Sequence, residues 1–392
     1  MFTDGIYAVK VDYLSKQKEI EYMKKILFFI PNLSVGGAEK VLVNLVNNMD
    51  RTKFDISVLS LFGRGVNEQF LKKDITYKYC FKKSFKGNSW ILKLFRPKSL
   101  YKHFIKKHYD IVISYLEGPT SRIVAGCPDN DTKKICWIHC RFDSKKTAQV
   151  GFRNFYEAKA LFNRFDYIAC VSELVKNYFC QTMDYNGRIK VLYNTNETKQ
   201  IYNNSLESVP DAFFDDSCFN LCSVGKIEPV KGFDRLARIH KRLLDDGIRH
   251  KFYILGDGSQ KKEIVAYLKK NQLEESFILM GYHTNPYKYM SKCDLFVCSS
   301  LSEGFSTAAT EALIVGTPVC TVEVSGMKEM LGNNNEYGVV TENSEEALYK
   351  GIKYLLENPE TLAHYKHQAE IRGKDFSTKN TVKAVEELFS SI

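Results

Sequence analysis

KKILFFIPNLSVGGAEKVLVNLVNNM, residues 24–49, decides the fold class of this chain. Residues 24–30 form an almost continuous apolar run, which is typical of a parallel strand buried on both faces. Gly36 and Gly37 follow, and from residue 38 the apolar residues recur at the spacing of an amphipathic helix. A strand, a glycine turn and a helix in this order predict the first βα unit of a parallel sheet.

The same alternation of strand and helix continues along the chain. Strand candidates follow at residues 54–62, 75–80, 110–116, 134–139, 166–172 and 189–194, and, after a lapse of the apolar pattern at 197–217, at 219–225, 251–257, 276–281, 294–300 and 317–324. We therefore predict an α/β protein of two Rossmann-like, doubly wound domains that face each other across a cleft. The carboxyl ends of the strands should line that cleft.

The predicted domains are residues 23–200 and 201–377, with the C-terminal helix at about 378–392 free to pack back on the first domain. A length of 392 residues fits two domains better than one core. Residues 1–22 have neither the basic nor the apolar region of a signal peptide, and we interpret them as an N-terminal extension. The longest apolar runs are shorter than the ~20 residues that cross a bilayer. The eleven cysteines lack CxxC pairs, which favours reduced thiols in the cytoplasm over a zinc site.

Charge is distributed unevenly along the chain. Residues 1–200 hold 34 Lys and Arg against 19 Asp and Glu, whereas residues 201–392 hold 22 against 27. The segment 75–109 has ten basic residues and no acidic one, interleaved with aromatic and aliphatic side chains. Such a segment suits an anionic membrane surface. A nucleic-acid patch and a merely solvated face remain the two alternatives.

Two short stretches of the second half carry the predicted chemistry. In GKIEPVKG, residues 225–232, Lys226 and Lys231 flank a strand-to-helix turn, where two cations can neutralise a diphosphate. In SLSEGFSTAATEAL, residues 300–313, Glu303 ends a strand and a helix is predicted to begin near Ser306. The amide groups at that helix start can bind phosphate, and Glu311 can accept hydrogen bonds from a ribose diol.

Together these motifs resemble glycosyltransferase family 4, the retaining enzymes of the GT-B fold. The resemblance runs from about Met23 to the C-terminus. Its residues are Gly36, Gly37, Ala38, Glu39, His139, Val171, Ser172, Asn194, Lys226, Lys231, Gly232, 256–258, 294–299, Glu303, Gly304, Phe305, Glu311, Ala312, 316–319, Ser325, Gly326 and Glu329.

The resemblance implies roles for individual residues. Lys226 and Lys231 would hold the diphosphate, Glu303 the donor sugar and Glu311 the ribose, with Gly36 and Gly37 approaching the phosphates from the other domain. The donor-binding set is completed by Gly304, Phe305, Ser306 and Thr307, and the catalytic set by His139. Lys226 stands where arginine is common in the family; a lysine keeps the charge but lacks the bidentate geometry of arginine. Ser306 stands where glycine is frequent. Neither change removes a required charge, so we expect an active enzyme.

We predict a metal-independent, retaining hexosyltransferase without a cofactor. Asp129 and Asp131 match the DxD pattern of metal-dependent transferases, but they lie in a polar turn rather than after an apolar strand. The expected donor is a nucleotide diphosphate sugar, with a UDP-sugar favoured. The expected acceptor is a lipid-linked saccharide or other glycan in bacterial surface-polysaccharide synthesis, at the inner face of the cell membrane.

Other functions leave distinguishable signatures. A sugar-nucleotide epimerase or hydrolase of the same fold would turn over its substrate without an acceptor. A catalytically silent subunit of a transferase is disfavoured by the intact lysines and glutamates. A nucleic-acid-binding protein is disfavoured because no known reading motif is present.

Overall fold

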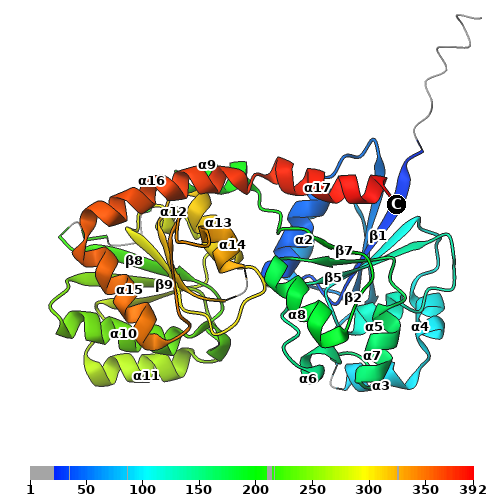
Figure 1. Cartoon of the computed structure of the whole chain (residues 1–392), viewed down its shortest axis with the longest axis horizontal. Helices are drawn as coiled ribbons and strands as arrows, with labels where there is room; N and C mark the ends of the chain where they lie inside the picture. Colours follow the sequence, from blue (N-terminus) through cyan, green and yellow to red (C-terminus); the bar gives the residue numbers. More distant parts are fainter. Residues whose placement is uncertain (1–21, 35, 86, 210–213, 216, 325) are drawn as a thin grey trace, which may run out of the picture.

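The computed structural model describes residues 22–392 except residues 35, 86, 210–213, 216 and 325. Of the predicted extension 1–22, residues 1–21 lie outside the described part, as do Lys86 of the acid-free segment and part of the predicted linker. The described chain forms two α/β domains side by side, as the sequence predicted (Figure 1).

The first domain contains a seven-stranded parallel sheet in the order β3-β2-β1-β4-β5-β6-β7. Its strands are β1 (Lys24–Ile30), β2 (Phe54–Phe62), β3 (Thr76–Phe81), β4 (Ile111–Tyr115), β5 (Lys133–Ile138), β6 (Tyr167–Cys170) and β7 (Ile189–Val191). The central strand β1 is buried from Ile26 to Ile30, which explains why its sequence is apolar without alternation.

Helices cover both faces of this sheet. They are α2 (Gly37–Asn48), α3 (Asn88–Leu94), α4 (Pro97–Phe104), α5 (Pro119–Val124), α6 (Lys145–Ala148), α7 (Phe155–Phe162) and α8 (Glu173–Met183), with a short 3₁₀ helix at Val66–Phe70. Strand order reverses between β1 and β4, so the loops that follow these two strands lie at the edge where doubly wound sheets bind ligands.

The second domain contains a six-stranded parallel sheet in the order β10-β9-β8-β11-β12-β13. Its strands are β8 (Phe219–Val224), β9 (His250–Leu255), β10 (Phe277–Gly281), β11 (Leu295–Cys298), β12 (Val319–Val322) and β13 (Val339–Thr341). Its helices are α10 (Phe233–Asp245), α11 (Lys261–Asn271), α12 (Tyr287–Met290), α13 (Thr307–Ile314), α14 (Met327–Leu331), α15 (Glu345–Glu357) and α16 (Pro359–Asp375), with a 3₁₀ turn at Pro229–Lys231. Strand β13 is the one strand of the described chain that the sequence pattern missed.

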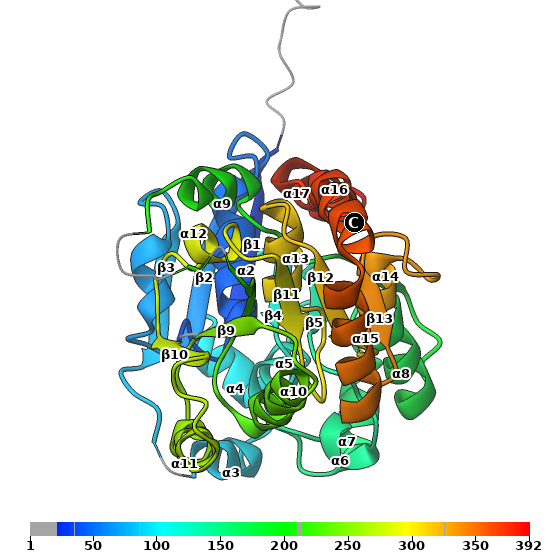
Figure 2. The same cartoon turned by 90° about the vertical axis from the view of Figure 1, so that its left-hand side faces the viewer.

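The chain passes between the domains twice along one edge of the molecule (Figures 1 and 2). The predicted linker holds a helix, α9 (Thr198–Ser205), and α16 leads into α17 (Thr378–Ser390), which lies on the first domain. The ring of Phe389 packs 6.0 Å from that of Phe28. The hydroxyl groups of Thr198 and Thr378 are 3.1 Å apart, so the two chain crossings touch each other.

Within the described residues, no helix is both long and apolar enough to span a bilayer.

Candidate active site

Lys231 and Glu303 lie together in a pocket at the carboxyl ends of β8 and β11. Lys231 Nζ is 2.6 Å from Glu303 Oε1, and Ser300 donates a hydrogen bond of 2.6 Å to the same oxygen. Ser299 and Ser306 also line the pocket. The sequence assigned the lysine to the diphosphate and the glutamate to the sugar, and the structure brings both groups into one ion pair.

The charge of this lysine is secured by its partner. Burial on its own would lower the pKa of Lys231, but the adjacent Glu303 carboxylate raises it above the ordinary lysine value. Lys231 is therefore a cation at neutral pH. A primary ammonium has three hydrogen-bond donors, so it can hold Glu303 and still donate to a phosphate oxygen in the same pocket.

The helix that follows this loop begins where the sequence indicated. Ser306 caps α13, and its hydroxyl oxygen accepts a 3.3 Å hydrogen bond from the amide of Ala309. Helix α13 points this N-terminus toward the first domain. A Cβ atom placed on Gly37 would lie 3.2 Å from Thr307 Oγ1, so Gly37 and Thr307 face each other across the domain boundary.

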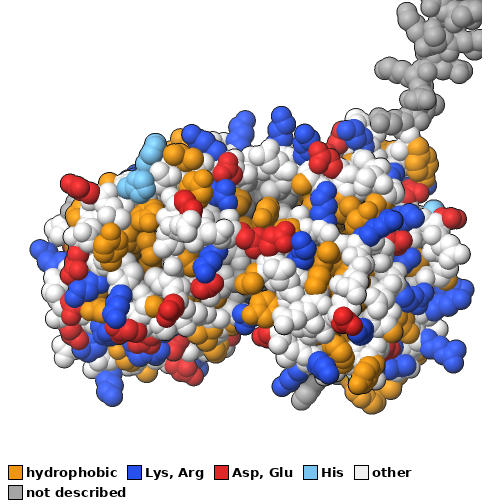
Figure 3. Space-filling view, in the orientation of Figure 1, with side chains coloured by type: hydrophobic (Ala, Val, Ile, Leu, Met, Phe, Trp, Pro, Cys, Tyr) orange, Lys and Arg blue, Asp and Glu red, His pale blue; other side chains and the backbone are white. Residues whose placement is uncertain are grey.

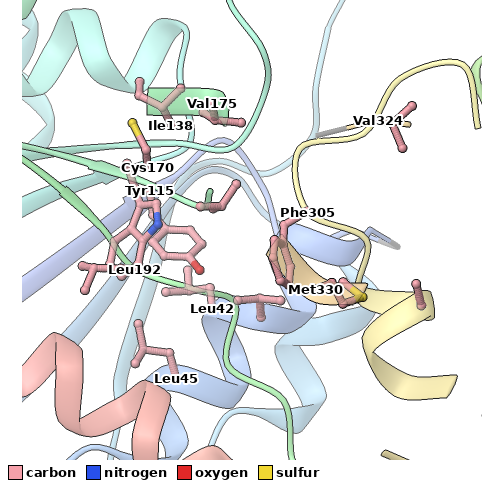
Figure 4. Packing of buried hydrophobic residues seen from close by; sticks show 14 of the residues in the cluster. Leu42, Leu45, Tyr115, Ile138, Cys170, Val175, Leu192, Phe305, Val324 and Met330 are labelled. Carbon is pink, nitrogen blue, oxygen red and sulfur yellow. The ribbon is translucent and has the colours of Figure 1, made fainter. Parts of the chain in front are cut away.

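Phe305 holds the loop in place across that boundary. Its ring packs 5.3 Å from the ring of Tyr193, and its carbonyl oxygen accepts a hydrogen bond of 3.3 Å from Asn194. Figure 4 shows Phe305 beside Met330 on one side of the boundary, with Leu42 of the first domain opposite. The side chain of this predicted donor-binding residue is buried and positions the loop, whereas its neighbours Glu303 and Ser306 line the pocket.

Glu311 pairs with a lysine that the sequence analysis did not single out. Lys40 of α2 is 2.6 Å from Glu311 Oε1, and both Lys40 and Glu311 are hydrogen-bonded to the hydroxyl of Tyr287. Burial on its own would lower the pKa of Lys40, but the Glu311 carboxylate outweighs burial and raises this pKa above the ordinary lysine value. The predicted ribose-binding carboxylate is thus also a contact between the domains. Lys40 directly follows the GGAE motif in the sequence, and this position was the signal that could have identified it.

The second predicted lysine is exposed at the same edge. Lys226 has no carboxylate within ion-pair distance among the residues that the structure describes. Its charge nevertheless reaches Glu39 of the first domain: burial raises the pKa of Glu39, and Lys226 counteracts part of that shift. A Cβ on Gly36 would collide with the Glu39 carboxylate, so Gly36 leaves room for that side chain. Lys226 is therefore free to neutralise an incoming anion.

Gly304 lies directly against the backbone of the first domain. A Cβ atom placed there would lie 1.7 Å from the carbonyl oxygen of His139, a distance that no real atom could occupy. Ser172 also donates a 3.3 Å hydrogen bond to the carbonyl of Gly304. Glu329 accepts hydrogen bonds from the amides of Glu173 (2.9 Å) and Leu174 (3.2 Å) at the start of α8. These contacts close the second domain onto the first.

His139 lies at the end of β5 with its ring inside the first domain. The ring centroid is 4.7 Å from that of Tyr115, and burial lowers the pKa of His139 to about 3. Its imidazole is therefore neutral at physiological pH. In the described chain, His139 Nε2, the Tyr115 hydroxyl and Asn194 Oδ1 are buried without a hydrogen-bond partner, which leaves polar atoms available near the cleft.

Asp129 and Asp131 lie elsewhere. They precede β5, whereas His139 follows it, so they sit at the opposite edge of the sheet. Both are exposed. Among the described residues, no group of three or more His, Cys, Asp or Glu side chains is arranged to hold a metal ion.

Comparison with known proteins identifies the family. The model for Glycosyltransferase Family 4 matches residues 35–199, and the model for Glycosyl transferases group 1 matches residues 210–372. The two matches cover the two sheet domains in turn. The chain belongs to glycosyltransferase family 4. The resemblance noted in the sequence is confirmed, and the protein is a glycosyltransferase.

This family 4 glycosyltransferase has relatives of matching length in Campylobacter jejuni. One, N-acetylgalactosamine-N,N'-diacetylbacillosaminyl-diphospho-undecaprenol 4-alpha-N-acetylgalactosaminyltransferase, is 28% identical over 367 residues, which cover 90% of this chain and 96% of the relative. A second, GalNAc-alpha-(1->4)-GalNAc-alpha-(1->3)-diNAcBac-PP-undecaprenol alpha-1,4-N-acetyl-D-galactosaminyltransferase, is 24% identical over 376 residues, covering 90% and 95%.

A solved structure confirms the GT-B fold of the glycosyltransferase. Anabaena Alr3699/HepE in complex with UDP-glucose superposes with a TM-score of 0.72 at 19% sequence identity. The match covers 94% of this chain and 100% of the other.

Proposed function

We propose that this glycosyltransferase transfers a sugar, with retention of configuration, from a UDP-sugar to a lipid-linked saccharide at the inner face of the cell membrane. The observation that carries the proposal is the Lys231–Glu303 pair, set in a pocket beside the start of α13 and against the first domain. The Anabaena neighbour was solved with UDP and with UDP-glucose, which supports a uridine donor.

The donor site follows from the charges at the cleft. Lys226 and Lys231 would offset the diphosphate, together with the amide groups at the start of α13. Glu303 would accept hydrogen bonds from the sugar, and Glu311 from the ribose. Because the nucleotide diphosphate gains charge as it leaves, cations fixed beside it lower the barrier of the transfer step.

For a retaining transfer, the state of Glu303 favours front-face attack over double displacement. A double displacement needs a free carboxylate nucleophile, but Glu303 already accepts hydrogen bonds from Lys231 and Ser300. We infer front-face attack by the acceptor hydroxyl. The new bond joins the acceptor oxygen to the anomeric carbon, the bond to the diphosphate breaks, and the departing diphosphate takes the electron pair and the proton.

We further propose that the reaction needs no metal ion, because two lysines and a helix start can supply the charge stabilisation. Turnover in EDTA should equal turnover in magnesium. A loss in EDTA that magnesium or manganese restores would overturn this part of the proposal and make Asp129 and Asp131 worth replacing.

The acceptor is inferred from the relatives. Both Campylobacter enzymes carry undecaprenol and a diphosphate in the names of their acceptors. We infer an acceptor of this chemistry, a saccharide on a polyprenyl diphosphate, used in surface-polysaccharide synthesis.

A surface on the first domain supports docking at a membrane. Helix α3 exposes 65% of Trp90 and 59% of Leu94, and Phe95 directly after it is 53% exposed. Figure 3 shows hydrophobic side chains gathered at the lower end of this domain, on the side where a notch separates the two domains. In the acid-free segment 75–109, lysines and an arginine are interleaved with these apolar residues, a combination that suits anionic lipid.

Two arginine side chains fix the end of α3 to the rest of the domain. Arg122, whose side chain is only 1% exposed, donates to the carbonyls of Leu92 and Phe95, both at 2.9 Å. Arg153 donates to the carbonyl of Lys93 at 2.6 Å. The end of α3 is thereby fixed to the domain through its backbone, while its apolar side chains remain in solvent. We propose that this surface binds anionic lipid reversibly.

Liposome co-sedimentation tests the docking surface. Binding should require anionic lipid and weaken as salt rises, because the Debye length falls from about 8 Å at physiological ionic strength to about 3 Å at 1 M. Reversal of four charges near α3 (Lys93, Arg96, Lys98 and Lys102 to Glu) should abolish it. The matched control reverses four exposed lysines of α16 and α17, on the opposite edge of the molecule (Lys366, Lys374, Lys379 and Lys383). If both variants bind equally, the surface is only a solvated face and does not dock on anionic lipid.

A donor screen tests the transfer itself. UDP release is measured from a panel of UDP-sugars, with and without polyprenyl diphosphate saccharides extracted from bacterial membranes. One donor should respond to the acceptor fraction. Release that is independent of acceptor would instead indicate a hydrolase or epimerase.

A further inference from the structure

A strained turn after β4 presents a carboxylate that neither the sequence motifs nor the family match assigned. Leu116 has φ 110° and Gly118 has φ 113°. A positive φ is rare for a residue with a branched side chain, and such conformations persist only where the surroundings enforce them. Glu117 stands between these two residues, at the edge of the sheet that faces the cleft.

The surroundings do enforce this turn. The carbonyl oxygen of Leu116 accepts hydrogen bonds from Ser114 Oγ (2.9 Å), Thr120 Oγ1 (3.2 Å) and Ser121 Oγ (3.2 Å). On the other side, a Cβ placed on Gly151 would lie 2.3 Å from the backbone of Gly118, so that loop presses directly on the turn. Three hydroxyls and a glycine contact thus fix the direction in which the next side chain leaves the backbone.

The Glu117 side chain lies on the first-domain side of the reaction site. Its Oε2 accepts a 2.9 Å hydrogen bond from the amide of His139, the residue whose carbonyl touches Gly304. The negative charge of Glu117 raises the pKa of the Cys140 thiol, and the charge of Glu303 adds to this shift. Cys140 therefore lies within electrostatic reach of both carboxylates, Glu117 from the first domain and Glu303 from the second.

The carboxylate also has unused capacity. In the part of the chain that the structure describes, no lysine or arginine lies within ion-pair distance of Glu117. An ionised carboxylate has about four acceptor positions, of which the amide of His139 and the thiol of Cys140 occupy two. Glu303, in contrast, is already bonded to Lys231 and Ser300. Glu303 is thus bonded to protein groups, whereas Glu117 has acceptor positions left for a ligand.

We propose that Glu117 binds the acceptor hydroxyl and aims its oxygen at the anomeric carbon. The hydroxyl donates a hydrogen bond to Glu117 before attack and keeps its proton. The acceptor oxygen then bonds to the anomeric carbon, the bond to the diphosphate breaks with its electron pair, and the proton ends on a departing phosphate oxygen. This assignment deepens the proposed function and rests on it, since it concerns the acceptor side of the same transfer.

The test compares Glu117→Gln with wild type in the acceptor-dependent transfer assay, using the extracted polyprenyl diphosphate saccharides and the selected UDP-sugar. The amide keeps the shape but loses the charge, so transfer should fall about 10²-fold, the upper scale for losing a hydrogen bond to a charged group. The KM for acceptor should rise, while the Kd for UDP, measured by calorimetry, should change less than about twofold. Glu117→Asp should recover part of the loss.

Glu68→Gln is the matched control. Glu68 is another carboxylate of the first domain that accepts a backbone amide hydrogen bond, at 2.7 Å from Gly65, but it lies in the 3₁₀ helix before β3. Transfer by Glu117→Gln at the level of this control would overturn the proposal. Parallel loss of UDP binding and transfer would also overturn it, because the turn would then be structural. An inactive wild type would instead count against the proposed function.

Discussion

Replacing Lys231 with alanine should lower both the turnover number and the free energy of unfolding. In the bound state this lysine faces the charge that develops on the diphosphate, and losing one such group costs about 10²–10³ in kcat. The same change leaves Glu303, whose side chain is 11% exposed, with only the Ser300 hydroxyl. A partly buried acceptor that loses its charged partner destabilises a protein by about 1–3 kcal/mol. We expect both losses in Lys231→Ala.

A double variant tells the two losses apart. Adding Glu303→Gln removes the orphaned carboxylate, so the free energy of unfolding should return toward wild type while turnover stays low. Denaturant unfolding and UDP release measure the two quantities. Lys241→Ala is the control: its ion pair with Asp245 is also 2.6 Å long but exposed, so little change is expected. Turnover that recovers together with stability in the double variant would refute a direct role for Lys231.

Three further outcomes follow from the site. Glu311→Ala should mainly weaken UDP binding, whereas Glu303→Ala should mainly lower kcat; equal losses of UDP affinity in calorimetry would contradict this division. Gly304→Ala should lower activity at least 10²-fold by blocking closure onto the first domain, whereas Gly37→Ala, with 3.2 Å to its nearest side-chain atom, should cost far less; equal kinetics would refute the closed arrangement. His139 has its folded pKa lowered to about 3, so its contribution to stability is complete above pH 6.5 and is lost as pH falls. At pH 5.5 that loss is about 1.4 kcal/mol, and His139→Gln should flatten this acid limb of the unfolding curve.

The strands and most helices could be predicted because their burial imposes a pattern on the sequence. Residues 24–30 are apolar throughout because both faces of β1 are covered. Strand β13 was missed because Val339 and Val340 are its only apolar residues and polar residues follow at once, whereas the equally short β7 continues into the apolar run VLY. Helix α9 was missed because its sequence, TKQIYNNS, has little apolar content, with Ile201 and Ser205 as its buried residues.

The site could be predicted only in its local parts. The start of α13 follows from Ser306 and the residues after it, since a helix cap is a local feature. The pairing of Lys40 with Glu311 joins residues 271 positions apart and depends on how the domains meet. Glu117 was missed because its signal is the positive φ of Leu116, which nearby hydroxyl groups and the contact with Gly151 impose and which no residue type reveals.

The central claim, retaining transfer to a lipid-linked saccharide, is tested most directly by the stereochemistry of the product. The selected UDP-α-sugar is incubated with the polyprenyl diphosphate saccharide, and the new linkage is assigned from the anomeric proton in an NMR spectrum. Front-face attack predicts an α-linked product. A β-linked product, or free sugar formed in place of a linked one, would contradict it.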